Sequence, residues 1–260
     1  MGFERIKKFR SGLAVVLACL FLTGCTAIPD QSAKSRMSYF IGVDVSGSFR
    51  DTPYFEDSLE FLAYYIYGHI NGLGKLKKPK SLFVGAVGGN YADDPQVFHS
   101  IYDFENKSPL DIHNGLKNWF VKKDHLTDFN TFFQSIAQLV KKRNLTLSPI
   151  TVLILSDGIP EGIDVKKGEA GRASYSKIDL TPLDYLARNI TLRIIYPPAK
   201  VAKNWEEYVS RKRVRLWTVA DEVMKGWRSQ LIEGELLESQ TKLLEWINYN
   251  VDYRVRVKKI

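Results

Sequence analysis

Two short stretches carry oxygen-bearing side chains at spacings suited to binding a hard divalent cation. The first, Asp44-Val-Ser46-Gly-Ser48, places a carboxylate and two hydroxyls at alternate positions. The second, Ser156-Asp157-Gly158, adds another carboxylate much later in the chain. Cations such as Mg²⁺ prefer oxygen ligands in near-octahedral geometry and keep some of their water. The two stretches therefore predict a cation site, provided that the fold brings them together.

Each stretch follows a segment with the pattern of a buried β-strand. These segments are residues 39–44 and 150–155, and the second is the most hydrophobic strand candidate after the N-terminal leader. Near-continuous apolar character is typical of strands in a parallel sheet that is covered on both faces. In open α/β sheets, ligands bind at the carboxyl ends of the strands, where the winding direction reverses. We therefore expect both stretches at that edge of one sheet.

Strand-like and helix-like segments alternate through the remaining chain. The patterns predict strands at 81–87, 97–104, 190–196 and 214–219, and helices at 55–70, 109–122, 130–142, 182–188, 205–212 and 222–248. Strands that alternate with helices at crossover lengths are typical of doubly wound folds. The sequence therefore predicts one α/β domain, with a mostly parallel sheet and helices on both faces.

At these residues the sequence resembles the von Willebrand factor type A domain family. Its metal-ion-dependent adhesion site uses Asp-x-Ser-x-Ser, a threonine and a later aspartate. Asp44, Ser46 and Ser48 match the first motif, and Asp157 matches the later aspartate in a Leu-Ser-Asp-Gly context common in the family. The resemblance covers roughly residues 37–219, and the ordered combination of motifs is more specific than Asp-x-Ser-x-Ser alone.

The threonine of the family motif has two candidates in this chain. Thr127 is the better match, because Phe133 then falls where the family usually has an apolar helix residue. Thr131 is the alternative. The sequence departs from the family at Leu126, where glycine often stands.

The resemblance implies a binding module and not an enzyme. Ser46, Ser48 and Thr127 would supply hydroxyl oxygens to Mg²⁺, directly or through water, with Mn²⁺ and Ca²⁺ as alternative ions. Asp44 and Asp157 would lie close to the ion and hold its waters. An acidic side chain of a partner protein would then complete the coordination shell, in an adhesion or envelope-assembly role.

Two other functions share these features. A metal-dependent hydrolase of the haloacid-dehalogenase type also places an aspartate after its first strand, but it normally needs a second aspartate two residues later. Ser46 occupies that position here, which counts against phosphoryl transfer. Ser46 is also not part of a Gly-x-Ser-x-Gly nucleophile elbow. The remaining alternative is a structural lipoprotein whose metal only fixes loops.

The N-terminus has the pattern of a bacterial lipoprotein signal peptide. A basic n-region, residues 1–10, precedes an apolar run at 13–22 that is too short to span a bilayer. The run ends in Leu22-Thr-Gly-Cys25, which looks like a lipobox whose cysteine accepts diacylglycerol. The sequence therefore predicts a signal peptide (1–24), a lipidated cysteine and tether (25–36), a type A-like domain (37–220) and a C-terminal helical extension with a basic end (221–260).

This assignment predicts a lipid-anchored location in the cell envelope. Thr26 follows Cys25, which in a Gram-negative cell favours the outer membrane, on its periplasmic or surface face. Cys19 leaves with the signal peptide, so the mature domain is expected to have no disulfide. Without the signal peptide, 33 basic and 28 acidic residues leave a net charge of +5. We expect no nucleic-acid partner. The basic stretches 75–80 and 211–213 are where contact with anionic headgroups or acidic glycans would occur. A solvated loop is the simpler interpretation of both stretches.

Overall fold

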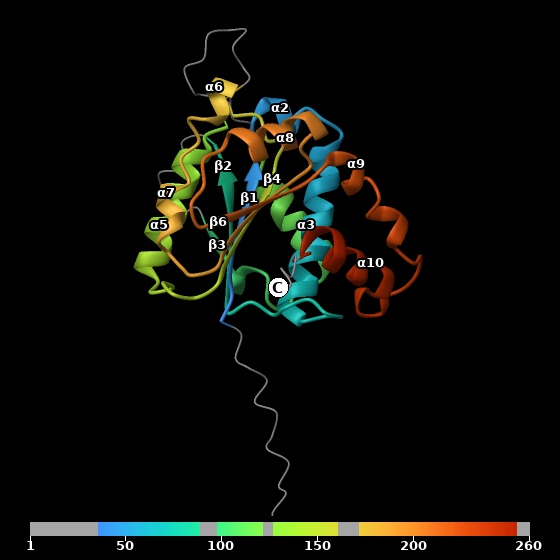
Figure 1. The fold of residues 1–260 in the computed structure, drawn as a ribbon. Coiled ribbons are helices and arrows are strands. Elements are labelled where there is room, and N and C mark those ends of the chain that lie inside the picture. The colour runs from blue at the N-terminus through green and yellow to red at the C-terminus, as the bar shows by residue number, and fades with distance from the viewer. Residues whose placement is uncertain (1–35, 89–97, 122–126, 161–171, 254–260) are drawn as a thin grey trace, which may run out of the picture. The chain divides into compact units, whose positions relative to one another are not determined.

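Six strands of the computed structural model form one sheet in the order β3-β2-β1-β4-β5-β6 (Figure 1). All neighbouring pairs are parallel except β2 and β3, which are antiparallel. This arrangement confirms the predicted mostly parallel sheet. The strands are β1 (Ser38–Asp44), β2 (Ser81–Val87), β3 (His99–Ser100), β4 (Ile150–Leu155), β5 (Ile190–Ile195) and β6 (Val214–Val219).

The structure describes residues 36–88, 98–121, 127–160 and 172–253. All of them belong to one compact unit, Ser35–Ile260. The predicted signal peptide, Cys25 and the basic C-terminal end 254–260 lie outside the described residues. Within the described ranges, no helix is both long enough and apolar enough to cross a membrane.

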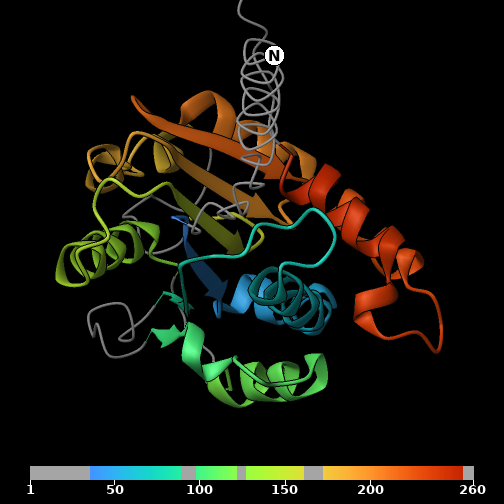
Figure 2. The ribbon, with the colours of Figure 1, turned by 90° about the horizontal axis from the view of Figure 1, so that it is seen from below.

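Helices cover both faces of the sheet, so the three-layer α/β fold is confirmed. Buried side chains of α3, α4 and α10 form the core on one face, and those of α5, α7 and α8 form the core on the other. Figure 2 shows α5 across the sheet from α3. The α-helices are α2 (Gly47–Arg50), α3 (Tyr54–Asn71), α4 (Pro109–Trp119), α5 (Phe129–Lys142), α6 (Arg172–Tyr175), α7 (Thr181–Asp184), α8 (Ala199–Tyr208), α9 (Asp221–Met224) and α10 (Thr241–Trp246).

Strand β1 is buried over its whole length and separates the two cores. Tyr39 and Val43 point to the α3 side, whereas Phe40 points to the α5 side. Gly42 also faces α5, and a ring carbon of Phe132 lies only 2.7 Å from where a Cβ at this position would be. The missing side chain lets α5 pack closely against β1. This close approach also brings the start of α5 toward the carboxyl end of β1.

The winding direction of the sheet reverses at β1. The chain passes from β1 to β2 on one side and later returns to pair β4 with the other side of β1. The carboxyl ends of β1 and β4 therefore flank the switch point where α/β sheets bind ligands. Asp44 ends β1, and Ser156 and Asp157 directly follow β4.

The predicted strand at 97–104 is wrong for most of its length. Among the described residues of this segment, 98–104, only His99 and Ser100 pair with β2, and a 3-10 turn, Ile101–Asp103, follows at once. The Ser100 N–H donates to the Asp103 carboxylate at 2.7 Å, which completes a capping box. This local hydrogen bond gives the backbone an alternative to the sheet, which the apolar pattern alone did not show.

The predicted continuous helix at 222–248 is also wrong. The segment consists of α9, 3-10 turns at Arg228–Gln230 and Leu237–Ser239, then α10 and a π-helical turn, Ile247–Val251. Gly234 has φ +79°, a backbone conformation that interrupts a helix. Gln240 supports the turn by bonding both the N–H and the carbonyl of Ile232 at 2.7 Å. The helix predicted at 205–212 occurs earlier, as α8, with Pro198 at its N-cap and Val209 at its C-cap.

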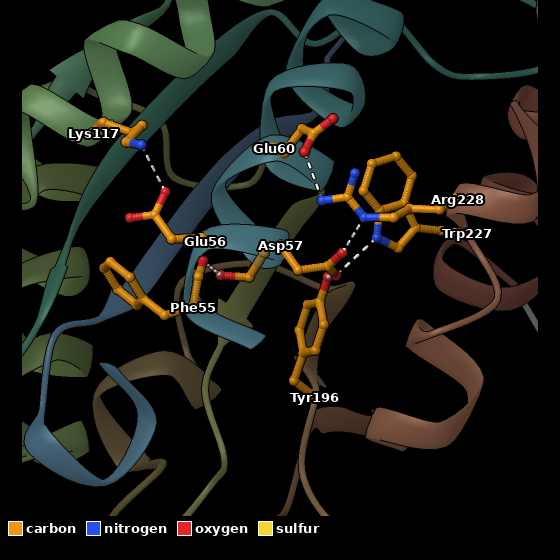
Figure 3. A network of polar contacts seen from close by, with 9 residues as sticks. Phe55, Glu56, Asp57, Glu60, Lys117, Tyr196, Trp227 and Arg228 are labelled. Atoms are coloured by element: carbon orange, nitrogen blue, oxygen red, sulfur yellow. Dashed lines mark hydrogen bonds and ion pairs between the residues drawn. The ribbon is translucent and has the colours of Figure 1, made fainter. Parts of the chain in front are cut away.

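The segment after β6 packs against α3 through a polar network centred on Asp57 (Figure 3). The Asp57 carboxylate accepts hydrogen bonds from Tyr196 Oη at 2.8 Å and Trp227 Nε1 at 2.9 Å. It also pairs with Arg228 Nε at 2.6 Å, and Arg228 Nη2 pairs with Glu60 at 2.6 Å. Residues 221–253 thus share one core with the sheet and do not extend outward.

Candidate metal site

The carboxylate of Asp44 forms the centre of the candidate site. Its side chain is fully buried at the end of β1. The N–H of Ser46 donates to Asp44 Oδ1 at 2.9 Å and turns the chain back over the strand end. The Ser46 and Ser48 hydroxyl oxygens lie 3.2 Å apart, with Ser46 buried and Ser48 half-buried. The predicted motif therefore gathers its three oxygen-bearing side chains at one point.

The start of α5 brings Thr127, and not Thr131, to Asp44. Thr127 Oγ1 lies 3.3 and 3.5 Å from the two Asp44 carboxylate oxygens. Thr131 instead bonds Asp128, through its hydroxyl at 2.6 Å and its N–H at 3.0 Å. Asp128 is thus the N-cap of α5, and capping accounts for both of these residues.

Ser156 also belongs to the cluster, although no role was predicted for it from the sequence. Its hydroxyl donates to Asp44 Oδ2 at 2.5 Å and accepts the N–H of Gly158 at 2.8 Å. Gly158 has φ +73°, and its carbonyl accepts from Trp205 Nε1 at 2.7 Å. The only sequence signal for Ser156 was its position directly before Asp157.

Asp157 completes the cluster from the β4 side. It is 8% exposed, and its Oδ1 accepts the Ile159 N–H at 3.0 Å. Its negative charge acts on Asp44, and the Ser48 hydroxyl bonds to it. The structure therefore brings together all five side chains singled out from the sequence: Asp44, Ser46, Ser48, Thr127 and Asp157. The flanking segments 122–126 and 161–171 lie outside the described residues.

The two carboxylates occupy an environment that disfavours their negative charges. Burial raises the pKa of Asp44 to about 7, the hydrogen bond from Ser156 opposes this shift, and the nearby charge of Asp157 adds to it. Burial also raises the pKa of Asp157, while hydrogen bonds from Ile159 and Ser48 partly offset the effect. Neither carboxylate forms an ion pair with any lysine, arginine or histidine that the structure describes.

This donor set fits a hard divalent cation. Two carboxylates lie among the neutral hydroxyls of Ser46, Ser48 and Thr127, and oxygen donors of this kind are the ligands that Mg²⁺ and Ca²⁺ prefer. Buried carboxylates without a counter-charge are costly, and a cation would remove that cost. Among the described residues no three or more His, Cys, Asp or Glu side chains gather at a possible metal position. Any cation here would thus depend on the hydroxyls as well as on the two carboxylates.

Comparison with known proteins leaves the family of this chain open. No family model matches the sequence, and neither does any curated protein. Similar folds occur in solved structures, at low sequence identity. The open conformation of the pilus adhesin SpaC from Lactobacillus rhamnosus GG has a TM-score of 0.43 and 11% identity, over 75% of this chain and 29% of SpaC.

Two further structures also show a low degree of likeness. Human COPII-coat protein Sec24c has a TM-score of 0.43 and 10% identity, over 75% of this chain and 32% of Sec24c. The VWA domain of SpRpn10 has a TM-score of 0.35 and 12% identity, over 78% of this chain and 93% of that domain. The chain spans about a third of the length of SpaC and Sec24c. At these values the function has to be argued from the site itself.

Proposed function

We propose that this chain is a lipid-anchored envelope protein that captures a protein partner through a divalent cation, Mg²⁺ in the first instance. One observation carries the proposal: Asp44 is a fully buried carboxylate surrounded by neutral donors, at the sheet's switch point, with no described cationic side chain paired to it. Such an arrangement costs stability unless a cation joins it. The resemblance to the type A family adds the expectation of adhesion.

The residues of the cluster divide into two roles under this proposal. Ser46, Ser48 and Thr127 would hold the cation through neutral oxygens, while Asp44 and Asp157 would balance its charge. A bound cation would supply an electrophilic centre, and an acidic side chain of a partner could complete its coordination shell. Ser48 and Asp157 are the members with exposed surface, so the partner would approach on their side.

A binding role agrees with the cluster better than hydrolysis does. A dehalogenase-type mechanism needs a carboxylic acid two residues after the first aspartate, and the side chain there is the Ser46 hydroxyl, which faces Ser48. Proton transfer from a hydroxyl is much less favourable than from a carboxylic acid near neutral pH. We therefore propose that the protein is not an enzyme.

The direct test of the site measures cation-dependent stability and partner capture together. Mg²⁺ added to the chelated protein should raise the melting temperature, because a ligand that binds only the folded state stabilises it. Asp157→Ala should abolish this rise and also abolish chelator-sensitive crosslinking to an envelope partner. Glu245→Ala, at an exposed carboxylate of α10 on the α3 side of the sheet, is the matched control and should behave like the wild type.

The outcomes separate partner capture from the loop-fixing structural role. A Mg²⁺-dependent melting shift without any chelator-sensitive partner would favour the loop-fixing structural role. An Asp157→Ala variant that keeps both the shift and the partner would sink the proposed site. The anchor is tested separately, because Cys25→Ser should move the protein from the membrane fraction to the soluble fraction and leave the Mg²⁺ shift intact.

A further inference from the structure

A polar cavity lies on the α3 side of the sheet, near the amino-terminal ends of β1 and β4. Its volume is about 320 Å³, and its lining includes Tyr39, Lys75, Lys77, Arg193, Tyr249 and Asp252. Tyr39 and Thr151 are neighbours in the sheet near the start of their strands, and Asp44 ends β1 at the other end. A strand of seven residues spans about 20 Å, so the cavity and the candidate metal site are well separated.

Arg193 is the unusual residue of this cavity. It lies in the middle of β5, whose other buried residues are apolar, and it is only 4% exposed. Its Nη1 donates to the carbonyl of Val251, and its Nη2 donates to that of Tyr253 at 3.0 Å. The buried Nε has no hydrogen-bond partner. Carbonyls satisfy donors without balancing charge, so the guanidinium keeps its positive charge, which opposes the effect of burial on the nearby carboxylate of Asp252 and lowers its pKa.

The acidic residue of the cavity is already committed to other partners. Asp252 lies 2.9 Å from His69 Nε2 and accepts the Tyr65 hydroxyl at 2.9 Å. His69 Nδ1 lies 2.9 Å from the Lys77 carbonyl, so both ring nitrogens face acceptors. Among the described residues, no carboxylate forms an ion pair with Lys75, Lys77 or Arg193. Three cationic groups therefore surround the cavity, and its carboxylate is paired with the histidine.

We propose that this cavity binds the phosphate group of an anionic membrane lipid. Guanidinium and ammonium groups are the side chains that recognise phosphate, and Arg193, Lys75 and Lys77 line this cavity. The exposed Tyr249 and Tyr253 at the same cavity match the aromatic residues that favour membrane interfaces.

The position of the cavity favours a membrane lipid over free phosphate. The Lys80 N–H donates to the Met37 carbonyl at 2.8 Å, which fixes the basic loop beside the point where the chain enters the domain. Eleven residues separate Cys25 from Met37, so a lipid on Cys25 would keep a membrane within about 40 Å of this end. This step rests on the proposed anchor. The cation site would then face away from the membrane, toward a partner.

The test uses the full chain purified from membranes in neutral detergent, with chelator present so that the cation site plays no part. Dihexanoyl phosphatidylglycerol, dihexanoyl phosphatidylcholine and inorganic phosphate are titrated separately by calorimetry. Phosphatidylglycerol should bind at least about tenfold more tightly than the other two. Lys75→Gln with Lys77→Gln should weaken its binding about tenfold, which corresponds to one charge-assisted hydrogen bond. Arg193→Gln should weaken it further.

The matched control is Lys141→Gln with Lys142→Gln, which removes the same charge from the exposed end of α5. If the control pair weakens phosphatidylglycerol binding as much as the cavity pair does, the binding comes from general electrostatic attraction and not from the cavity. Equal affinity for inorganic phosphate and phosphatidylglycerol would show that the cavity does not select a lipid. If phosphatidylglycerol does not bind at all, the proposal is wrong. The lysine pair lies on an exposed loop, so its result stands even if Arg193→Gln fails to fold. The lipid is added from solution and no cation is present. A negative lipid-binding result would therefore not depend on the lipid at Cys25 or on the metal site.

Discussion

Two aspartates of this protein, Asp44 and Asp57, are surrounded by hydrogen-bond donors in different ways. Asp57 bonds Tyr196 and Trp227 and pairs with the guanidinium of Arg228 (Figure 3). Asp44 is more deeply buried, and its donors are two hydroxyls and one backbone N–H, all neutral. One carboxylate has its counter-charge within the fold, and the other has none among the described residues.

This difference separates a structural carboxylate from a candidate ligand. A charge that is paired inside the protein holds two segments together, here α3 and the segment after β6. A buried charge with neutral donors destabilises the fold on its own, and such groups concentrate at functional sites. The partners of an aspartate are therefore more informative than its burial. Substitutions at Asp44, Asp57 and Ser156 test this distinction.

The largest effect is expected from Asp44→Asn in the absence of cation. The pKa of Asp44 is about 7 in the folded protein and near 3.8 in the unfolded chain. Between these values the folded state binds the extra proton, so the stability of the wild type should fall as pH rises from about 4 to 7. The loss amounts to about 4 kcal/mol at most, since one pKa unit is worth about 1.4 kcal/mol.

The asparagine cannot ionise, so this pH-dependent loss should be absent from Asp44→Asn. Chemical denaturation in the presence of chelator gives the free energy of unfolding of both proteins at pH 5 and pH 8. The wild type should lose stability between these values, and the variant should not. Mg²⁺ should stabilise the wild type at pH 8 and leave the variant unchanged. If the variant is less stable than the wild type at pH 8, the charge of Asp44 stabilises the fold without a cation, as that of Asp57 does.

Asp57→Ala should destabilise the fold by about 3 kcal/mol at every pH between 5 and 8. The substitution leaves Trp227 Nε1, the Tyr196 hydroxyl and Arg228 without their shared acceptor, and each unsatisfied donor is costly. The partial exposure of Arg228, at 48%, keeps the value below that of a fully buried pair. Denaturation midpoints measure the change, and the affinity for Mg²⁺ should remain that of the wild type. A large loss of Mg²⁺ affinity would instead connect the two clusters.

Ser156→Ala should produce the smallest effect. It removes the 2.5 Å hydrogen bond to Asp44 and leaves the Gly158 N–H without its acceptor, at a cost of about 1 kcal/mol. Losing this donor raises the pKa of Asp44 further, because the bond favours the charged form. Mg²⁺ should therefore bind about fivefold more weakly at pH 7, with most of the affinity recovered at pH 8.5. Calorimetric titration at both values tests this, and a pH-independent loss would assign Ser156 a purely structural role.

The regular parts of the fold were readable from the sequence, because burial on both faces leaves a continuous apolar run. Strands β2, β4 and β6 have the predicted bounds, and α5 begins within one residue of its prediction. Two of the errors lie where side chains bond the nearby backbone. Ser100 and Asp103 end β3 early, and Gln240 supports a turn inside the predicted C-terminal helix. A hydrophobic pattern contains no information about such bonds.

Residue types were enough to select the oxygen-bearing side chains, and the strand pattern placed Asp44 and Asp157 at strand ends. The choice between Thr127 and Thr131 as the neighbour of Asp44 required the packed fold, because both lie near the start of α5 and Thr131 bonds the N-cap Asp128. The role of Ser156 and the cavity that brings Arg193 together with the basic stretch 75–80 were also invisible in the chain. Each depends on which groups the fold buries together, and the energy of a buried charge is set by its neighbours in space.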